Sequence, residues 1–359
     1  MRLSFLILLL MLLCAPAFSQ TGYSSKNKQA IKHYAAANRH MDSRMYDEAI
    51  AELKEALKDD PAFIEAHIQL ADVSRFKSDY KQAIEHYTKA IAVNPEFNRG
   101  VYLKLGEVEI NEAMYPQAQQ HLEKYLTYPN FNTQNSAYAQ KLVTDCQFSI
   151  QALKRPVAFK PINMGPEINS VDDEYMPVAT ADEGMLIFTR KINNNEDFYR
   201  SLKKDDKWQT ATSLSSRINT PNYNEGAQSI SQDGKYLFFT GCNRPDGRGK
   251  CDIYIVQKKG DSWDKPLSLN PPVNTGAWES QPSISADGNT LYFVSNKAGG
   301  FGGYDIWKTI LTDNGWAEPE NMGPNINTPY DEQSPFIHPD DNTLYFCSNG
   351  WPGMGNKDL

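Results

Sequence analysis

The sequence predicts a multidomain chain of two structural classes in series. The first is an all-α solenoid of repeated helix pairs over residues 28–154, and the second is an all-β propeller of four-stranded blades over residues 156–359. Two periodicities lead to this prediction. Similar residues recur every 34 positions before about residue 153 and every 51 to 54 positions after residue 156. Repeats of these lengths are typical of stacked units that bury their hydrophobic faces against their neighbours.

The composition is that of a folded globular protein and argues against nucleic acid as a partner. Of the 359 residues, 40% are hydrophobic and 22% are charged, and the net charge is −8. No basic stripe occurs in the sequence. Binding to nucleic acid and electrostatic docking to anionic lipid both need such a stripe.

The first 19 residues predict a secretory signal peptide. Arg2 precedes the apolar run 3–13, and Ala17-Phe18-Ser19 offers a small-residue cleavage site. The run is too short to span a membrane, and no later segment reaches the length of a transmembrane helix. We therefore expect a mature protein that leaves the cytoplasm and has no membrane span. Lipid attachment at Cys14 is not expected, because leucines stand where a lipobox needs small residues.

Small and large residues at fixed positions predict the helix pairs. In each second helix an Ala lies four positions before a residue that is large enough to pack over it. The repeated positions are Tyr46, Tyr80 and Tyr115; Ala49, Ala83 and Ala118; Leu53, Tyr87 and Leu122; and Ala56, Ala90 and Tyr125. Pro61, Pro95 and Pro129 end the three units, because proline cannot continue a helix. A further helix, about residues 136–153, is expected to cap the stack.

These repeats resemble the tetratricopeptide repeat family. The resemblance rests on Tyr80-x-x-Ala83-Ile84-x-x-Tyr87-x-x-Ala90-x-x-x-x-Pro95 and on Leu70-Ala71 in the preceding helix. It implies a solenoid whose first helices line a groove that binds peptides or proteins. The residues of these helices that we nominate as partner contacts are His67, Arg75, Lys104 and Glu107. The alternative is that these side chains only form solvated faces.

The strand half repeats one series of marker residues four times. Each unit has an Asn, a Glu that leads into the first strand, an Asp in a turn, a Phe in the second strand and an Asp that opens the third strand. The first three units also have a Trp before the fourth strand. The markers are Asn169, Asn219, Asn274 and Asn327; Glu174, Glu225, Glu279 and Glu332; Asp182, Asp233, Asp287 and Asp340; Phe188, Phe239, Phe293 and Phe346; Asp197, Asp252, Asp305 and Asp358; and Trp208, Trp263 and Trp316. Four short strands with an aromatic anchor predict a propeller blade. Asp287-Gly288 predicts a tight hairpin with positive φ at both residues, and the apolar run 291–294 after it suits a strand buried on both faces.

The strand units resemble the WD40-like repeats in the propeller of the periplasmic translocation protein TolB. The resemblance rests on Ser285-Ala286-Asp287-Gly288-x-x-Leu291-Tyr292-Phe293 and on Gly299-Gly300-x-Gly302-Gly303-x-Asp305-Ile306-Trp307. It covers about 200 residues. It implies a propeller whose blades each carry the same turns and loops.

The repeated carboxylates are interpreted as structural. A catalytic pair of acids occurs once in a site, whereas these Glu and Asp residues recur in every unit, so we expect them to accept hydrogen bonds from backbone amides. The Gly-rich stretch 298–303 opens no helix and does not fit a phosphate-binding loop. The run 193–197 is expected to be a solvated loop rather than a Ca²⁺ site. Motifs for acyl transfer or metal-dependent hydrolysis do not occur, so we expect no catalytic residue, cofactor or metal.

The four cysteines that follow the signal peptide predict one disulfide. Cys242 and Cys251 flank a single inter-strand loop, and a bridge between them suits an oxidising compartment. The alternative is two unpaired thiols. Cys146 and Cys347 have no evident partner, and no pattern of zinc ligands surrounds any of the four.

The order of the two halves indicates a broader kinship. The fourth strand unit stops at Asp358-Leu359, two residues into its third strand, so we expect a fragment with further blades beyond it. Helical repeats followed by blades with the GGFGGYDIW motif resemble exported Bacteroidota envelope proteins of the OmpA-family, PorE-like type associated with type IX secretion. That resemblance implies a non-catalytic periplasmic scaffold at the outer membrane, with envelope or secretion-system proteins as partners and a peptidoglycan-binding, OmpA-like domain beyond Leu359. The alternatives are an enzyme that processes carbohydrate or peptidoglycan at the propeller mouth and a receptor-like sensor of nutrient uptake.

Overall fold

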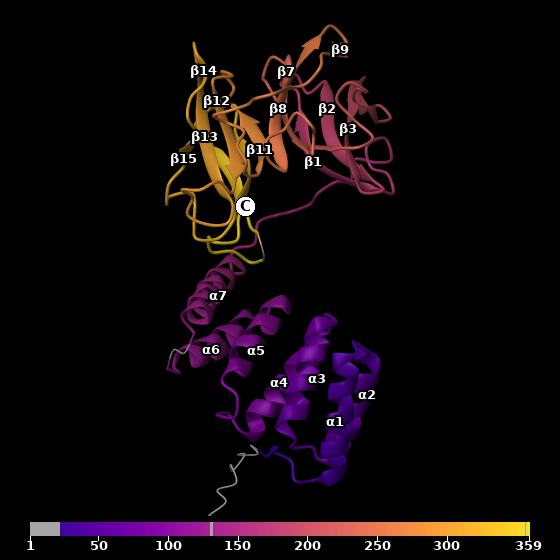
Figure 1. The fold of residues 1–359 in the computed structure, drawn as a ribbon, viewed down its shortest axis with the longest axis vertical. Helices are drawn as coiled ribbons and strands as arrows, with labels where there is room; N and C mark the ends of the chain where they lie inside the picture. The colour runs from indigo at the N-terminus through magenta and orange to yellow at the C-terminus, as the bar shows by residue number, and fades with distance from the viewer. Residues whose placement is uncertain (1–21, 130–131, 356) are drawn as a thin grey trace, which may run out of the picture. The chain divides into compact units, whose positions relative to one another are not determined.

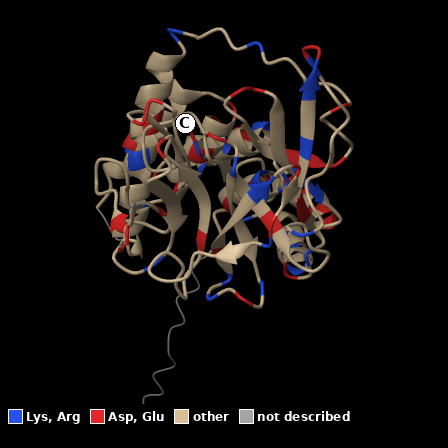
Figure 2. Ribbon diagram, turned by 90° about the horizontal axis from the view of Figure 1, so that it is seen from above, with Lys and Arg blue, Asp and Glu red and all other residues tan. Residues whose placement is uncertain are grey.

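The computed structural model describes residues 22–129, 132–355 and 357–359 (Figure 1). The predicted signal peptide and Cys14 lie outside these ranges. Within them, seven helices come first and seventeen strands follow. The chain divides into two compact units between Gln147 and Phe148. Lys and Arg are interspersed with Asp and Glu along both units, with no long stretch of one sign (Figure 2).

The helical unit consists of consecutive helix pairs. The helices are α1 (Lys28–Asp42), α2 (Tyr46–Asp59), α3 (Ile64–Phe76), α4 (Tyr80–Val93), α5 (Gly100–Asn111), α6 (Tyr115–Leu126) and α7 (Thr133–Ala152). The second helix of each pair begins at one of the three aligned tyrosines, as the repeat pattern predicts. The division between the two units falls within α7, and residues 154–162, the predicted boundary, follow this helix without regular structure.

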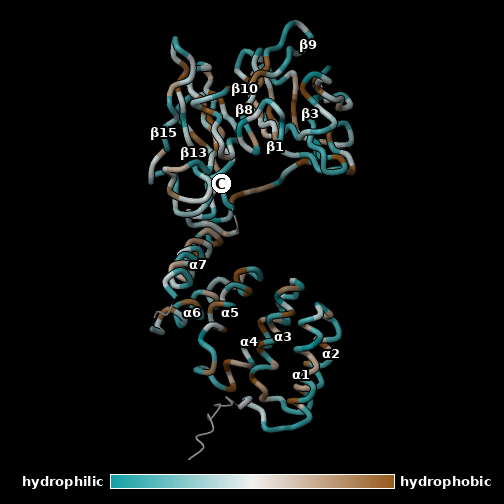
Figure 3. The backbone as a smooth tube through the Cα atoms, in the orientation of Figure 1, coloured by the Kyte–Doolittle hydropathy of each residue, from teal (hydrophilic) through white to brown (hydrophobic). Residues whose placement is uncertain are grey.

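Small residues on the first helices allow the second helices to approach closely. The equivalent small residues are Ala37, Ala71 and Gly106. A Cβ added to Gly106 would lie 2.5 Å from Cγ of Leu122, so only glycine fits at this position. Leu122 and its counterparts Leu53 and Tyr87 are fully buried. Hydrophobic and hydrophilic stretches alternate along these helices (Figure 3), which is typical of helices that bury one face.

The strand unit consists of antiparallel sheets that follow one another in chain order (Figure 1). The first contains β1 (Asp173–Ala179), β2 (Met185–Ile192), β3 (Asn195–Lys204), β4 (Lys207–Trp208) and β5 (Thr212–Ser213). The second contains β6 (Asn224–Ile230), β7 (Tyr236–Cys242), β8 (Cys251–Lys259), β9 (Ser262–Trp263) and β10 (Leu267–Ser268). The third contains β11 (Glu279–Ile284), β12 (Thr290–Ser295), β13 (Asp305–Thr312), β14 (Gly315–Trp316) and β15 (Glu320–Asn321), and the fourth contains β16 (Glu332–Ile337) and β17 (Leu344–Ser348). The predicted fourth strand is therefore two short strands, both paired with the third strand of the same blade.

The second strand of each inner blade is buried on both faces. Phe239 of β7 packs in a cluster with Ile187 of the first blade, whereas the adjacent Phe238 packs with Leu291 of the third blade. Neighbouring side chains on a strand point to opposite faces, so β7 is covered by a blade on each side. In β12, Leu291 and Phe293 on one face and Val294 on the other are fully buried, as the apolar run 291–294 predicts.

The hairpin turn differs from its prediction in one respect. Gly288 has a φ of 75°, but Asp287 does not take a positive φ. The carboxylate of Asp287 instead accepts the hydroxyl of Ser285 at 2.5 Å and the N–H of Asn289 at 2.9 Å. Asp at this place is explained by the hydrogen bonds of its side chain rather than by a left-handed backbone.

The first strand of every blade contains a bulge that the sequence does not announce. One residue per blade adopts a φ between 49° and 53°, and the pairing register shifts around it. These residues are Met176, Ala227, Gln281 and Ser334. None of them is glycine, so their own backbone preferences do not favour a positive φ. The contacts of the surrounding blade therefore hold the bulge.

Candidate functional site

Three of the four nominated partner contacts lie together on the first helices of the solenoid. Arg75 Nη1 of α3 is 2.9 Å from Glu107 Oε2 of α5, and Lys104 Nζ of α5 is 2.8 Å from Asp72 Oδ1 of α3. The side chains of these two ion pairs are 23–40% exposed. Tyr87 of α4 donates its hydroxyl to the same Asp72 carboxylate. We call these four charged residues, Asp72, Arg75, Lys104 and Glu107, the α3–α5 charge ladder.

The charged side chains of the ladder are partly buried between the helices and partly exposed to solvent. Burial raises the pKa of Glu107, and the adjacent Arg75 counters that effect. The pairs join two consecutive first helices, so they contribute to the geometry of the solenoid, and their exposed parts remain open to solvent. Sequence analysis missed Asp72, although its spacing of 32 residues from Lys104 matches that between Arg75 and Glu107.

The prediction for His67 is wrong. Its side chain faces α4 and is only 3% exposed. His67 Nδ1 lies 2.9 Å from His86 Nδ1, and His67 Nε2 lies 3.0 Å from the carbonyl oxygen of Pro61. The contact with a carbonyl requires a proton on His67 Nε2, so His67 Nδ1 accepts the N–H of His86. Two histidines 19 residues apart therefore form a buried neutral pair, and His67 is withdrawn as a groove contact.

Each first-strand Glu of the strand unit accepts several hydrogen bonds from its own blade. Glu279 accepts the N–H of Thr275 at 2.9 Å, the hydroxyl of Thr275 at 2.5 Å and the hydroxyl of Ser295 at 3.2 Å. Glu332 repeats the pattern with Thr328 and Ser348. Glu279 and Glu332 are fully buried, and burial raises the pKa of Glu279. The prediction that these carboxylates hold turns and strands together is confirmed.

In the second blade the first-strand Glu also accepts a side-chain hydrogen bond, but the donor is an arginine rather than a serine. Gly241 occupies the position of Ser295, so it cannot supply a hydroxyl, and Arg244 Nη1 donates to Glu225 Oε1 at 2.8 Å instead. A Cβ on Gly241 would lie 2.5 Å from Cδ of Arg244, so the glycine provides the space that the arginine fills. Burial raises the pKa of Glu225 to about 7. In the first blade Glu174 is more exposed. Burial raises its pKa, but the hydrogen bonds with Ser170 and Arg190 together outweigh burial and bring the pKa below the usual value.

The third-strand Asp residues anchor the loops that precede them. Asp305 Oδ2 accepts the N–H of Phe301 at 2.7 Å, and Asp252 Oδ2 accepts the N–H of Arg248 at 3.0 Å. Asp358 accepts the N–H of Met354 at 2.8 Å. A Cβ on Gly300 would lie 1.8 Å from Asp305 Oδ2. The Gly-rich loop is therefore shaped around a carboxylate of its own blade and is not arranged as a phosphate cradle.

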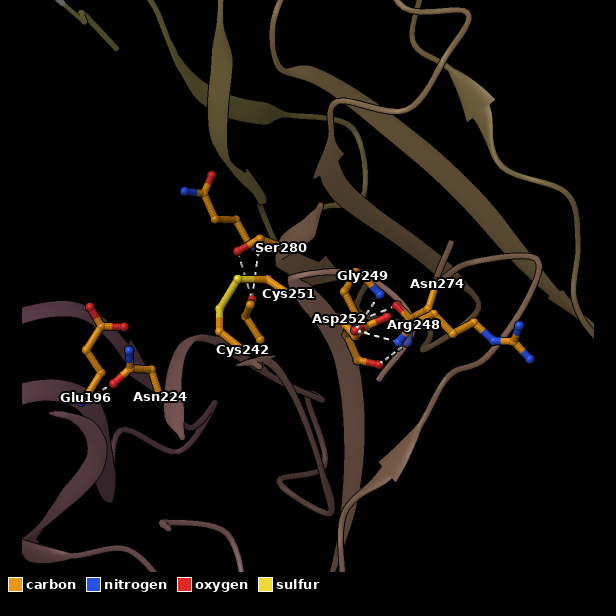
Figure 4. The surroundings of a disulfide bond; sticks show 12 residues. Glu196, Asn224, Cys242, Arg248, Gly249, Cys251, Asp252, Asn274 and Ser280 are labelled. Atoms are coloured by element: carbon orange, nitrogen blue, oxygen red, sulfur yellow. Dashed lines mark hydrogen bonds between the residues drawn. A yellow bond between two sulfur atoms is a disulfide. The ribbon is translucent and has the colours of Figure 1, made fainter. Parts of the chain in front are cut away.

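Cys242 and Cys251 lie opposite each other where β7 ends and β8 begins, and a disulfide joins them (Figure 4). In the third blade Asn296 stands at the position of Cys242, and its side-chain oxygen accepts the N–H of Trp278 at 3.0 Å. The disulfide thus joins the second strand to the third, whereas Asn296 joins the second strand of its blade to the start of the first. Cys146 is buried with its thiol pKa raised to about 12 by burial, and Cys347 is half-buried and unpaired.

The remaining candidates for chemistry have structural explanations. Asn193 and Asn194 form the turn between β2 and β3 with φ values of 49° and 66°. Across the described ranges, no group of three or more His, Cys, Asp or Glu side chains is placed to bind a metal ion. A cleft of about 110 Å³ between the first strands is lined by Ser229 and Ser283, whose hydroxyls accept backbone N–H groups of the neighbouring blades. None of the described helices has the length and apolar character needed to cross a membrane.

Comparison with known proteins found one matching family model and several similar solved structures. Residues 64–97 match the family model described as tetratricopeptide repeat. TolB from Acinetobacter baumannii is similar in structure, with 14% identity and a TM-score of 0.37 over 51% of this chain and 39% of the TolB chain. The present chain thus spans about two fifths of that structure. No curated protein matches the sequence.

Solved helical-repeat structures are similar to the first unit. The first tetratricopeptide-repeat domain of Spaghetti (RPAP3), determined with an HSP90 peptide bound, is 17% identical, with a TM-score of 0.32 over 36% of this chain and all of that domain. YrrB, a tetratricopeptide-repeat protein with an unusual peptide-binding site, is 22% identical, with a TM-score of 0.30 over 33% of this chain and 58% of its own. At these identities the likeness concerns the fold alone. The predicted fold class, a helical-repeat solenoid followed by consecutive antiparallel blades, is confirmed.

Proposed function

We propose that this protein is a non-catalytic scaffold that docks other proteins through the surfaces of its repeat units. The observation that carries this proposal is the α3–α5 charge ladder, which lines up four partly exposed charges on consecutive first helices. An extended peptide that crosses the first helices would meet alternating positive and negative groups. Such a surface selects partners by charge pattern, because like charges placed opposite each other are strongly unfavourable.

The arrangement of the strand unit supports a role without catalysis. Its recurring carboxylates are buried and occupied by hydrogen bonds, as Glu279 and Asp305 illustrate. A general acid or base must reach the substrate from a cleft. The serines along the cleft between the first strands are likewise occupied as acceptors for backbone N–H groups.

The finer assignment rests on the sequence. We propose that the mature protein resides in the periplasm, associated with the outer membrane, and docks envelope or secretion-system proteins. Support comes from the signal-type N-terminus, from the kinship with PorE-like proteins and from a disulfide, which persists in an oxidising compartment. A link to peptidoglycan through an OmpA-like domain beyond Leu359 belongs to the same proposal. Cell fractionation tests it, together with mass spectrometry that should place the mature N-terminus at Gln20.

Partner capture from membrane extracts tests the docking role. The informative variant exchanges the charges of one pair, Arg75→Glu together with Glu107→Arg, because this keeps the ion pair while it inverts the charges shown to a partner. Lys58→Glu on α2, where the Lys58 side chain is 74% exposed, is the matched control. We expect the wild type and the control to capture the same envelope protein and the exchanged variant to lose it.

Two results would overturn the proposal. One is equal capture by the exchanged variant with an unchanged circular dichroism spectrum, which would remove the charge ladder from recognition. The other is hydrolysis of peptidoglycan or oligosaccharide by the purified protein in the absence of any captured protein, which would favour the enzymatic alternative.

A further inference from the structure

We propose that the start of α3 is a docking site for a partner protein segment in which an aromatic residue is followed by serine. In the free protein, residues 22–25 of the same chain occupy this site, and we call them the N-terminal arm. A partner that carries the same two residues binds by displacing the arm. The site rests on the docking role proposed above but uses residues outside the α3–α5 charge ladder.

The arm makes three hydrogen bonds with the first turn of α3. The backbone N–H of Ser24 donates to Glu65 Oε1 at 2.9 Å, and the Ser24 hydroxyl donates to Glu65 Oε2. The same hydroxyl oxygen accepts the backbone N–H of Ile64 at 3.0 Å. The N-cap residue of α3 is Phe63, whose side chain cannot cap a helix, so Ser24 supplies the cap from a distant part of the sequence.

Aromatic rings make the apolar half of the same contact. The Tyr23 ring lies edge-on to the rings of Tyr34 and Phe63, with centroid distances of 5.3 Å and 5.9 Å. Phe63 is fully buried, whereas Tyr23 is 40% exposed and Ser24 is exposed. The arm therefore lies on the surface of the helical unit as a ligand would, and its two adjacent residues supply one apolar and one polar contact.

The following repeat shows that a first helix of this solenoid does not require such an arm. Phe97 lies 34 residues after Phe63 and is 40% exposed, so the fold tolerates an uncovered ring at this place. The start of α5 is capped locally, because Asn98 Oδ1 accepts a backbone N–H of its own first turn at 3.0 Å. Arg99 stands at the position of Glu65. The combination found at α3 is thus not a general property of the repeat.

The arm site lies on the same face of α3 as the charge ladder. Glu65 precedes Asp72 by seven residues, which is about two helical turns. Burial raises the pKa of Tyr34, and the negative charges of Glu65 and Asp72 raise it further, so this ring lies near both carboxylates. An extended partner segment that displaces the arm can therefore continue along α3 to the ladder.

The arm can leave its site without unfolding the helical unit. On the proposed cleavage after Ser19, three residues precede Tyr23, so no folded element has to move when the arm leaves. At its other end Ser25 is 2% exposed and Asn27 caps α1, so the arm stays tethered close to the site. A ligand on a short tether has an effective concentration in the millimolar range, so the arm competes with a weakly bound partner segment.

Peptides with the sequence of the arm test the site directly. The probe is acetyl-Thr-Gly-Tyr-Ser-amide, which corresponds to residues 21–24, and the control peptide has alanine in place of both Tyr and Ser. Each peptide is titrated into the ¹⁵N-labelled mature protein, and the amide signals of Ile64 and Glu65 are followed by NMR. The control peptide should not bind.

A double variant, Tyr23→Ala with Ser24→Ala, removes the competing arm. We expect the probe to give saturable shifts at millimolar concentration in this variant. In the wild type we expect binding to be about tenfold weaker, because the arm competes at its effective concentration. Lys26→Ala, at an exposed residue beside the arm, is the matched control and should behave as the wild type.

Saturation in the double variant, together with weaker binding in the wild type, supports the arm site. The proposal is overturned if the double variant does not bind the probe, if the control peptide binds equally well, or if a further Glu65→Ala change leaves binding unaltered. A concentration-dependent dimer of the wild type in sedimentation would assign the site to the arm of a second copy and would also overturn it.

Two features keep the outcome clear. If the double variant failed to fold, the wild type would still decide, because the probe at about ten times higher concentration must shift the same two amides while the control peptide must not. None of these measurements involves capture of an envelope protein. Failure of the arm site is therefore distinguishable from failure of the charge ladder as a docking surface.

Discussion

Replacing Gly302 with alanine should loosen the junction between the third and fourth blades. A Cβ at this position would lie 1.8 Å from the carbonyl oxygen of Tyr330 and 2.6 Å from that of Thr328. Both obstacles are backbone atoms, so no side chain can rotate away. To restore a contact of 3.0 Å, the loop and the facing segment must separate by about 1.2 Å.

The size of the effect follows from the hydrogen bonds across this junction. The N–H of Gly303 donates to Tyr330 O at 2.9 Å, and the N–H of Glu332 donates to Tyr304 O at 2.8 Å. The N–H of Tyr304 donates to Asp331 Oδ1 at 3.2 Å. A separation of about 1.2 Å breaks most of these bonds, and each contributes about 0.5–1.5 kcal/mol, so we expect a loss of about 2–4 kcal/mol. For a unit of this size, that loss lowers the unfolding temperature by about 5–12 °C.

Tryptophan fluorescence measures this change in the strand unit alone, because all six tryptophans lie between Trp208 and Trp351. Gly276→Ala is the matched control, since no atom lies within 4 Å of its Cβ and its φ is not left-handed. We expect the control to unfold within about 2 °C of the wild type or slightly above it. The reasoning about the junction would be refuted if Gly302→Ala unfolded at the same temperature as Gly276→Ala.

Three further changes test other parts of the fold. Acidification from about pH 6.5 to 4 should destabilise the helical unit, because burial lowers the pKa of His86 to about 4 and lowers that of His67. The unfolded state then takes up protons that the folded state refuses, at up to about 3 kcal/mol for His86. Urea unfolding followed by far-UV circular dichroism should show this dependence, and a profile that stays as steep in His86→Gln would argue against it. Reduction of Cys242–Cys251 should lower the stability of the strand unit by about 2–3 kcal/mol. Peptide mapping without reductant should find these two cysteines linked, and free thiols at both would disprove the bridge. Ala83→Leu places a larger side chain at a fully buried position and should destabilise the helical unit by about 1–3 kcal/mol. An unchanged thermal midpoint would contradict the helix register.

Repetition explains what could be predicted from the sequence. Tyr46, Tyr80 and Tyr115 mark the first residues of α2, α4 and α6, because the same packing problem recurs in each helix pair. The structural role of the marker Glu and Asp residues can likewise be predicted, because a carboxylate that recurs in every blade makes the same kind of hydrogen bonds in each. A residue type that every repeat needs in the same surroundings recurs at a fixed spacing, so its role can be predicted from a single sequence.

Features held by long-range contacts were not visible. The bulge residues, such as Met176 and Gln281, share no residue type, so nothing in the sequence distinguishes them. The position of His67 in a first helix predicts a groove residue, but its ring turns toward His86 in the following helix. Helical periodicity gives the element to which a residue belongs, whereas the direction of one side chain depends on the helix packed against it.

The second blade shows how a departure from the repeat is to be interpreted. Gly241 removes a hydroxyl that Glu225 would need, and Arg244 supplies the missing donor in the space that the glycine leaves. Such a departure is compensated within its own blade, so it needs no external partner to explain it. Arg248 and Phe301 differ in another way, because both are exposed at equivalent loop tips whose backbone N–H groups are held in the same manner. No contact in the described chain accounts for a cation at one tip and a phenyl ring at the other. On the propeller, substitutions that test partner capture should therefore begin at these two residues.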